Sequence, residues 1–359
     1  MLRLVAILFA LLPTTIAAKT EIIGDLPRKA SFPAEETPGL DTRYEVVCAA
    51  NGSRLRAILT RPIGATAPLP AILLTQWVSC GSIEFRPERD SDLRWFARQS
   101  GMVLIRIERA GTGDSEGPGC DKLDYNTEVA DYRAALDQLA RHPWVDPGRI
   151  IVYGSSLGST VAPLVARGRK VAGVIVQGGG AVTYLERMIG FDRLNLERSG
   201  KFTPDQVGRE MIRRIRFQMS YLLEKKTPEE VVATHPDLAG VWESLLGTGE
   251  KPHYGRPYAW HWQAAEQDWL SAWATIDAPV MVVFGEYEQF EMRHGHRLIV
   301  DTVNRLRPGT ATWLEIPKAG HDLEIYPDQY AAYRFEGGEA RPELFVEPVV
   351  SWMKTVASR

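Results

Sequence analysis

This sequence of 359 residues has few cysteines and histidines and no large excess of charge of either sign. Its three cysteines form no Cys-x-x-Cys motif and its seven histidines no His-Glu-x-x-His motif, so we expect neither a zinc cluster nor a dithiol redox site. The 42 Lys and Arg residues nearly balance the 45 Asp and Glu residues, which gives no electrostatic reason to expect a nucleic acid partner. A hydrophobic fraction of 45% with 24% charged residues excludes a disordered or collagen-like chain.

The apolar run at the N-terminus is too short to cross a membrane. It covers residues 4–12, follows a single charge at Arg3, and ends at Pro13 before small residues up to Ala18. A spanning helix needs about 20 apolar residues, whereas this pattern is typical of a cleaved signal peptide. We therefore expect residues 1–18 to be removed on export to the periplasm or the medium, with no stable membrane span afterwards.

Short apolar runs that alternate with amphipathic stretches fill most of the chain. The runs lack strict alternation, which is typical of strands buried on both faces, and alternating β and α elements predict an α/β protein with a mostly parallel sheet flanked by helices. Asn51-Gly52 predicts a tight hairpin between strands at 44–49 and 55–60. Further strands are expected at 71–74, 102–107, 150–153, 171–176, 279–284 and 312–316. Helices are expected at 92–98, 128–141, 157–167 and 292–306.

Two segments depart from this alternation. Residues 19–43 are polar and contain three prolines, so we expect an extended N-terminal segment before a single α/β domain at 44–359. Residues 181–275 show no strand after the sixth predicted one, and we expect a helical cap inserted there, over one end of the sheet. Its helices are predicted at 209–224, 228–234 and 260–273. Its many Trp and Tyr residues are expected to pack in a core rather than to contact a ligand.

The sequence Gly154-Ser155-Ser156-Leu157-Gly158 lies between a predicted strand and a predicted helix. In this context Gly-x-Ser-x-Gly predicts a sharp turn that exposes the hydroxyl of Ser156 as a nucleophile, and it needs small residues on either side. The structural alternative is a helix N-terminus that Ser155 or Ser156 merely caps.

A serine hydroxyl needs a base, and that base needs a carboxylate to orient it. His321 follows the last predicted strand, and Gly320 before it allows a close approach. The nearest other candidates are His294 and His296, which we expect at the surface. Glu288 follows the strand at 279–284 and is the predicted acid, with Glu286 as an alternative.

Two backbone N–H groups are candidates for an oxyanion hole. One belongs to Leu157, the residue after the proposed nucleophile, and the other to Trp77 in the loop after the strand at 71–74. Two such donors aimed at a developing oxyanion supply several kcal/mol of transition-state stabilisation, about 3 kcal/mol for one of them.

These residues resemble the α/β-hydrolase superfamily, and they look most like its exported bacterial members grouped with dienelactone-hydrolase-like and S9-peptidase-like proteins. The chain order Ser156, Glu288, His321 is the order of that fold. The resemblance implies an eight-stranded sheet and hydrolysis of esters, thioesters or amides without a cofactor. The matching segments are Thr75-Gln76-Trp77-Val78-Ser79-Cys80, Arg109-Ala110-Gly111-Thr112-Gly113-Asp114-Ser115-Glu116-Gly117, Gly154-Ser155-Ser156-Leu157-Gly158, Gly285-Glu286-Tyr287-Glu288 and Gly320-His321.

The sequence departs from the family pattern at two positions. Many relatives carry His-Gly where this chain has Gln76-Trp77, and the acid is commonly Asp where this chain has Glu288. Gly111-Thr112-Gly113 could be taken for a dinucleotide-binding motif, but no helix opens directly behind it, and we interpret it as a tight turn.

Cys80 and Cys120 both lie just past the ends of strands that the fold would make neighbours. Export permits disulfides, so we hypothesise that these two cysteines pair and brace the oxyanion loop, which leaves Cys48 unpaired.

The sequence therefore predicts an exported serine hydrolase that cleaves small-molecule carboxylic esters through an acyl-enzyme intermediate on Ser156. It needs no cofactor and no metal. A peptidase, amidase or thioesterase of the same fold remains an alternative, and so does a non-catalytic binding protein that keeps this fold.

Overall fold

The computed structural model describes residues 18–86, 91–245 and 253–359. The expected signal peptide falls outside the described residues, except for Ala18 at its end. In the part of the chain that the structure describes, no helix is both long and apolar enough to span a membrane.

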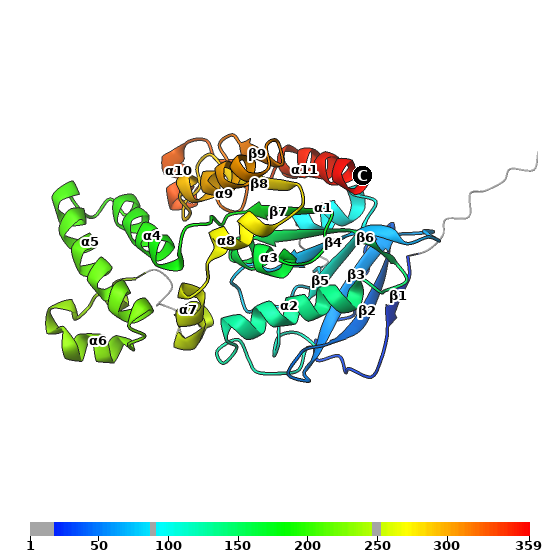
Figure 1. Ribbon diagram of the computed structural model, residues 1–359, viewed down its shortest axis with the longest axis horizontal. Coiled ribbons are helices and arrows are strands. Elements are labelled where there is room, and N and C mark those ends of the chain that lie inside the picture. Colours follow the sequence, from blue (N-terminus) through cyan, green and yellow to red (C-terminus); the bar gives the residue numbers. More distant parts are fainter. Residues whose placement is uncertain (1–17, 87–90, 246–252) are drawn as a thin grey trace, which may run out of the picture.

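The described residues form one sheet of nine strands in the order β1-β2-β3-β5-β4-β6-β7-β8-β9 (Figure 1). β3 pairs antiparallel with β2 and with β5, and the other neighbours are parallel. This confirms the predicted fold class. The sheet has one strand more than the resemblance implies, because β1 forms in the N-terminal segment. The strands are β1 (Thr20–Ile22), β2 (Leu40–Cys48), β3 (Arg54–Pro62), β4 (Leu69–Thr75), β5 (Val103–Ile107), β6 (Val145–Ser155), β7 (Gly173–Gln177), β8 (Val280–Gly285) and β9 (Ala311–Ile316).

Helices cover both faces of the sheet because its central strands are apolar on both sides. Along β4, Leu73 joins a core cluster with α2, α3, α8 and α9, whereas Ile72 and Leu74 join a second cluster with α1 and α11. The four helices expected around the sheet are present, and α10 and α11 were not predicted. The helices of this layer are α1 (Asp92–Gln99), α2 (Tyr125–Leu139), α3 (Gly158–Ala166), α9 (Arg293–Leu306), α10 (Gln329–Arg334) and α11 (Pro342–Ala357).

The described chain between β7 and β8 contains no strand and is largely helical. In Figure 1 its α4, α5 and α6 stand away from the sheet at one end of the molecule, and α7 and α8 lead back to it. The predicted helix at 260–273 is two helices, because the side chain of Asp268 accepts a hydrogen bond from Ser271 N and starts a new one. The helices are α4 (Tyr184–Arg198), α5 (Pro204–Gln218), α6 (Pro228–Thr234), α7 (Tyr258–Ala265) and α8 (Trp269–Thr275), with a π-helical turn at Met219–Leu223.

Aromatic residues of this segment pack together. Trp260, Trp269 and Trp273 are fully buried. The rings of Trp260 and Trp269 each meet the ring of Tyr184 edge-on, with centroids 6.1 Å apart. The preference for a core role is confirmed for Trp269 and Trp273, whereas Trp260 and Tyr254 also border the cavity described below.

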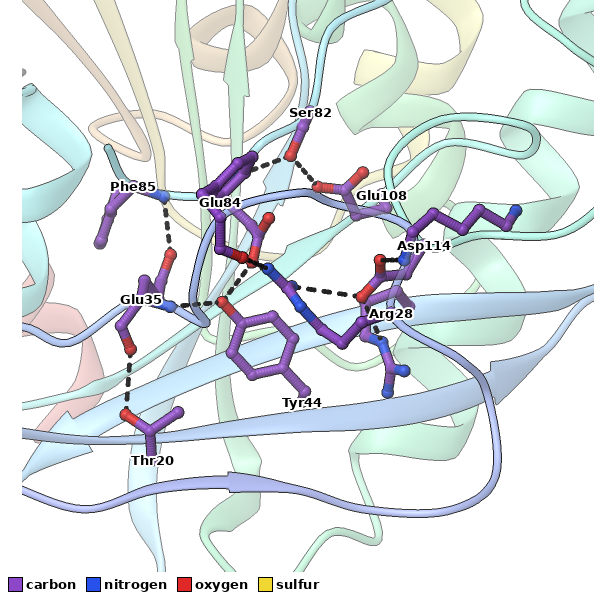
Figure 2. A network of polar contacts seen from close by, with 12 residues as sticks. Thr20, Arg28, Glu35, Tyr44, Ser82, Glu84, Phe85, Glu108 and Asp114 are labelled. Carbon is purple, nitrogen blue, oxygen red and sulfur yellow. Dashed lines mark hydrogen bonds and ion pairs between the residues drawn. The ribbon is translucent and has the colours of Figure 1, made fainter. Parts of the chain in front are cut away.

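A polar network fastens the N-terminal segment to the loop that follows β4 (Figure 2). Arg28 Nη1 lies 2.5 Å from Glu84 Oε1, and Glu35 Oε2 accepts a hydrogen bond of 2.6 Å from the N–H of Phe85. The hydroxyl of Tyr44 donates to the same Glu84 oxygen. These contacts hold the outer part of the loop at Glu84 and Phe85. The inner part of the loop, at Trp77 and Val78, borders the candidate site.

Candidate active site

Ser156 sits in a sharp turn between β6 and α3. Its φ of 52° is in the left-handed region that non-glycine residues rarely adopt, and its N–H donates to Gln177 O at 2.7 Å. A Cβ on Gly154 would approach Gly158 O to 2.5 Å, and a Cβ on Gly158 would approach Thr75 O to 1.9 Å. The two glycines are therefore required by packing, and the structural alternative of a simple helix cap does not account for them.

The structure brings Ser156, His321 and Glu288 into one hydrogen-bonded chain. His321 Nε2 lies 2.9 Å from Ser156 Oγ, and His321 Nδ1 lies 2.9 Å from both carboxylate oxygens of Glu288. The three residues meet because β6, β8 and β9 are parallel, so the loops after their carboxyl ends share one edge of the sheet.

Glu288, and not Glu286, is the carboxylate at the histidine. Glu288 Oε1 also accepts from Phe290 N at 2.8 Å and from Glu291 N at 3.2 Å. Glu286 instead accepts from Lys318 N at 2.8 Å. The two alternatives that the sequence leaves open are thus separated by where each carboxylate lies.

The pair is electrostatically coupled. Burial lowers the pKa of His321, but the nearby Glu288 carboxylate outweighs burial and raises it to about 9. Burial raises the pKa of Glu288, and the imidazole outweighs that effect and lowers it to about 2. Each group therefore stabilises the charged form of the other, which is the arrangement a general base needs when it receives a proton.

The two candidate oxyanion donors lie on adjacent segments. Leu157 directly precedes α3, and Trp77 follows β4 after one residue. The close approach of Gly158 to the carbonyls of Thr75 and Gln76 brings these segments together. Both Leu157 and Trp77 border the same cavity as Ser156.

A cavity of about 670 Å³ opens beside Ser156 and His321. Its wall is mainly apolar, and α4 contributes four residues to it, although α4 was not predicted. A capping box made by Thr183 and Glu186 was a sequence signal that could have located this helix. The aromatic residues of the wall are Trp77, Tyr153, Tyr184, Phe191, Tyr254, Trp260 and Phe290.

Other predicted residues have mixed outcomes. Cys80 and Cys120 form a disulfide, and Cys48 is free and exposed. The expectation that His296 lies at the surface is wrong, because its ring is fully buried and packs edge-on against Phe284. His294 is exposed, as expected.

Gly111-Thr112-Gly113 forms a tight turn, in which a Cβ on Gly113 would lie 1.5 Å from the carboxylate of Glu108. The next helix, α2, begins only at Tyr125, so no helix opens directly behind the turn. The residues that the structure describes include no group of three or more His, Cys, Asp or Glu side chains that could hold a metal ion.

One comparison with known proteins shows the family. The sequence profile described as the Alpha/beta hydrolase family matches residues 91–333. The polyketide transferase ATR5 of Stachybotrys chlorohalonatus is 32% identical over 82 residues, which are 23% of this chain and 27% of that protein. The chain thus matches only about a quarter of the length of such curated relatives.

Two solved structures are similar over nearly their whole length. A hypothetical protein of Pseudomonas aeruginosa has a TM-score of 0.53 and 16% identity, and the match covers 91% of this chain and 96% of that one. An esterase of Pyrococcus furiosus has a TM-score of 0.51 and 13% identity, with 95% and 98% covered. At these identities the likeness establishes the fold.

Proposed function

We propose, from the premise that the chain belongs to the alpha/beta hydrolase family, that it is a serine hydrolase of carboxylic esters. The observation that carries this proposal is the unbroken hydrogen-bonded chain from Ser156 Oγ through His321 to Glu288. It ends at a cavity large enough for a drug-sized acyl or alkyl group.

In the proposed reaction, Ser156 Oγ attacks the ester carbonyl carbon while His321 Nε2 takes the hydroxyl proton. Glu288 stabilises the imidazolium that forms. The N–H groups of Leu157 and Trp77 donate to the oxyanion of the tetrahedral intermediate. The intermediate collapses to an acyl ester on Ser156, and His321 gives its proton to the departing alcohol. A water molecule, activated by His321, then releases the carboxylic acid.

The cavity wall favours an apolar acyl group of substantial size. Its seven aromatic side chains offer large flat surfaces, and burial of apolar area contributes about 25 cal/mol per Å². The names of the matched relatives, a polyketide transferase and an esterase, are compatible with acyl chemistry at such a site. Thioesters and amides are the substrates of the competing proposals.

We also propose that the mature protein begins near residue 19 and acts outside the cytoplasm. The N-terminal signal-peptide pattern supports export. The Cys80–Cys120 disulfide supports an oxidising compartment, since such bonds are rare in the cytosol. N-terminal sequencing of the protein from the periplasm or medium tests this, and an intact Met1 in the cytosolic fraction would overturn it.

The activity is tested with p-nitrophenyl esters of increasing acyl length and purified residues 19–359. We expect hydrolysis by the wild type, none above background by Ser156→Ala, and a preference for longer acyl groups. Fluorophosphonate labelling of Ser156 reports the nucleophile separately from substrate choice. Labelling without ester hydrolysis would move the proposal to thioesters or peptides. Neither labelling nor hydrolysis by the folded protein would favour a non-catalytic binding role.

A further inference from the structure

Four consecutive backbone carbonyls in the loop after β4 all point at buried arginine side chains. Arg256 Nη2 donates to the carbonyl of Val78 at 3.2 Å. Arg109 donates to the other three, which are those of Gln76, at 3.0 Å, Trp77 and Ser79. A run of four carbonyls bound by two cations is not explained by strand or helix formation, because this loop belongs to neither.

The two arginines are held by one carboxylate. Arg109 Nε lies 2.5 Å from Glu128 Oε1, and Arg256 Nη1 lies 3.4 Å from Glu128 Oε2. Trp260 Nε1 donates to the same Oε2 at 3.1 Å. All three charged side chains are at most 2% exposed. Burial raises the pKa of Glu128, but the two guanidinium groups outweigh burial and lower it to about 2, so the carboxylate is ionised.

The direction of these carbonyls fixes the direction of the N–H groups. In a planar trans peptide the N–H points opposite to the C=O of the same unit. Because the carbonyl of Gln76 faces Arg109, the N–H of Trp77 points away from Arg109, and the N–H of Val78 does so for the same reason. Both Trp77 and Val78 border the cavity that contains Ser156.

The cluster joins segments that are far apart in the chain. Arg109 follows β5, Glu128 lies in α2, and Arg256 lies in the helical segment between β7 and β8. A Cβ on Gly255 would lie 3.3 Å from Cys80 Sγ, so that segment also touches the disulfide in the loop. The outer part of the loop is held separately by the network in Figure 2.

We propose that Arg109 and Arg256, held by Glu128, are positioning residues that preset the oxyanion hole by fixing the peptides of residues 76–79. They touch no reacting atom. This inference rests on the proposed serine hydrolase function, but the order that the arginines impose on the loop does not depend on it. Arg256 comes from the helical segment that also lines the cavity, so the proposal links the position of that segment to the order of the oxyanion loop.

The test substitutes Arg256 by Met. This leaves the ion pair of Arg109 and Glu128, which has no net charge, intact. Arg214→Met is the matched control, because Arg214 lies in the same helical segment, is equally buried, pairs with Asp192, and donates to the carbonyl of Ser244 instead of to the loop. Arg256→Lys retains the positive charge and a single donor nitrogen in place of three. Two readouts are compared in all four proteins: kcat and KM for the best ester, and hydrogen exchange of peptides that span residues 74–83.

We expect Arg256→Met to lower kcat by at least about 10-fold with little change in KM. The substitution frees the Val78 carbonyl and one side of Glu128, the carboxylate that also holds Arg109, so the Trp77 peptide loses its fixed direction. The donor on that peptide acts only in the transition state. Exchange in residues 74–83 should rise in the same variant, and Arg256→Lys should recover part of both. Arg214→Met should change neither, even where it lowers the melting temperature.

The proposal is overturned if Arg256→Met exchanges like the wild type in this loop, or if its kcat falls no more than that of Arg214→Met. A fall that only follows lost stability in all three variants would also overturn it. Where the wild type hydrolyses no ester, the proposed function fails. The exchange measurement alone then decides whether Arg256 orders the loop.

Discussion

The pH dependence of Glu288→Gln is the sharpest test of the proposed relay. In the wild type, Glu288 raises the pKa of His321 to about 9 against the ordinary histidine value of about 6.5. That difference corresponds to about 3 kcal/mol in favour of the imidazolium. Because the neutral imidazole is the base, kcat/KM of the wild type should rise with pH, with a midpoint well above 6.5.

Glutamine at position 288 keeps the size of the side chain and removes its charge. The burial that opposes the imidazolium is then offset only by the weaker attraction of the Asp322 and Glu291 carboxylates, so the midpoint should move down toward 6.5. The plateau should also fall by about 10³–10⁴-fold, since an amide no longer stabilises the imidazolium and can hold the wrong tautomer. The assay is kcat/KM for one ester from pH 5 to 10, with Ser156→Ala as the background.

Glu286→Gln is the control, because it makes the same substitution two residues away on a carboxylate that binds Lys318 N instead of the histidine. It should leave the midpoint where the wild type has it. An unmoved midpoint in Glu288→Gln, or equal shifts in the two variants, would refute the assignment of Glu288 as the partner of His321.

Two further predictions concern the framework of the site. Gly158→Ala should lower the free energy of unfolding by at least about 1–3 kcal/mol, because its Cβ would lie 1.9 Å from a carbonyl oxygen of β4. Urea unfolding measures this beside the control Gly208→Ala, whose Cβ has open space in α5. Equal stabilities of the two variants would contradict the prediction. Replacing both Cys80 and Cys120 by Ala should lower the free energy of unfolding by about 4 kcal/mol, because a cross-link over 40 residues is lost. Cys48→Ala should cause no measurable change. An unchanged urea midpoint in the double variant would show that the disulfide does not stabilise the fold.

The fold and the relay could be predicted from the sequence because their causes are local. A buried parallel strand is an apolar run, and the turn at Ser156 needs glycine on both sides, since even a Cβ there would overlap backbone atoms. His321 and Glu288 each follow a strand, and parallel strands bring such positions to one edge of the sheet. Chain order and strand pattern were therefore sufficient to bring the three loops together, whereas the choice between Glu288 and Glu286 needed the structure.

One of the helices that were not predicted, α4, has polar residues where the pattern needs apolar ones. The inner face of α4 buries Arg187 and Asp192, which pair with Glu291 and with Arg214 from outside the helix. Such pairs satisfy buried charges, but they erase the apolar periodicity that reveals a helix. The burial of His296 depends in the same way on packing against Phe284, which is a tertiary contact.

The departure from the family pattern at Gln76-Trp77 also depends on contacts between residues far apart in the chain. The proposed hole uses a backbone N–H, so the side chain at each position is free to differ, provided that the peptide keeps its direction. In this chain Trp77 borders the cavity, while the carbonyls on either side of its Cα face Arg109. The residue that matters for the second donor is thus Arg109, which stands 32 positions further along the chain. A sequence motif specifies side chains at fixed positions, and it cannot identify a backbone donor whose direction is set by a side chain elsewhere in the chain.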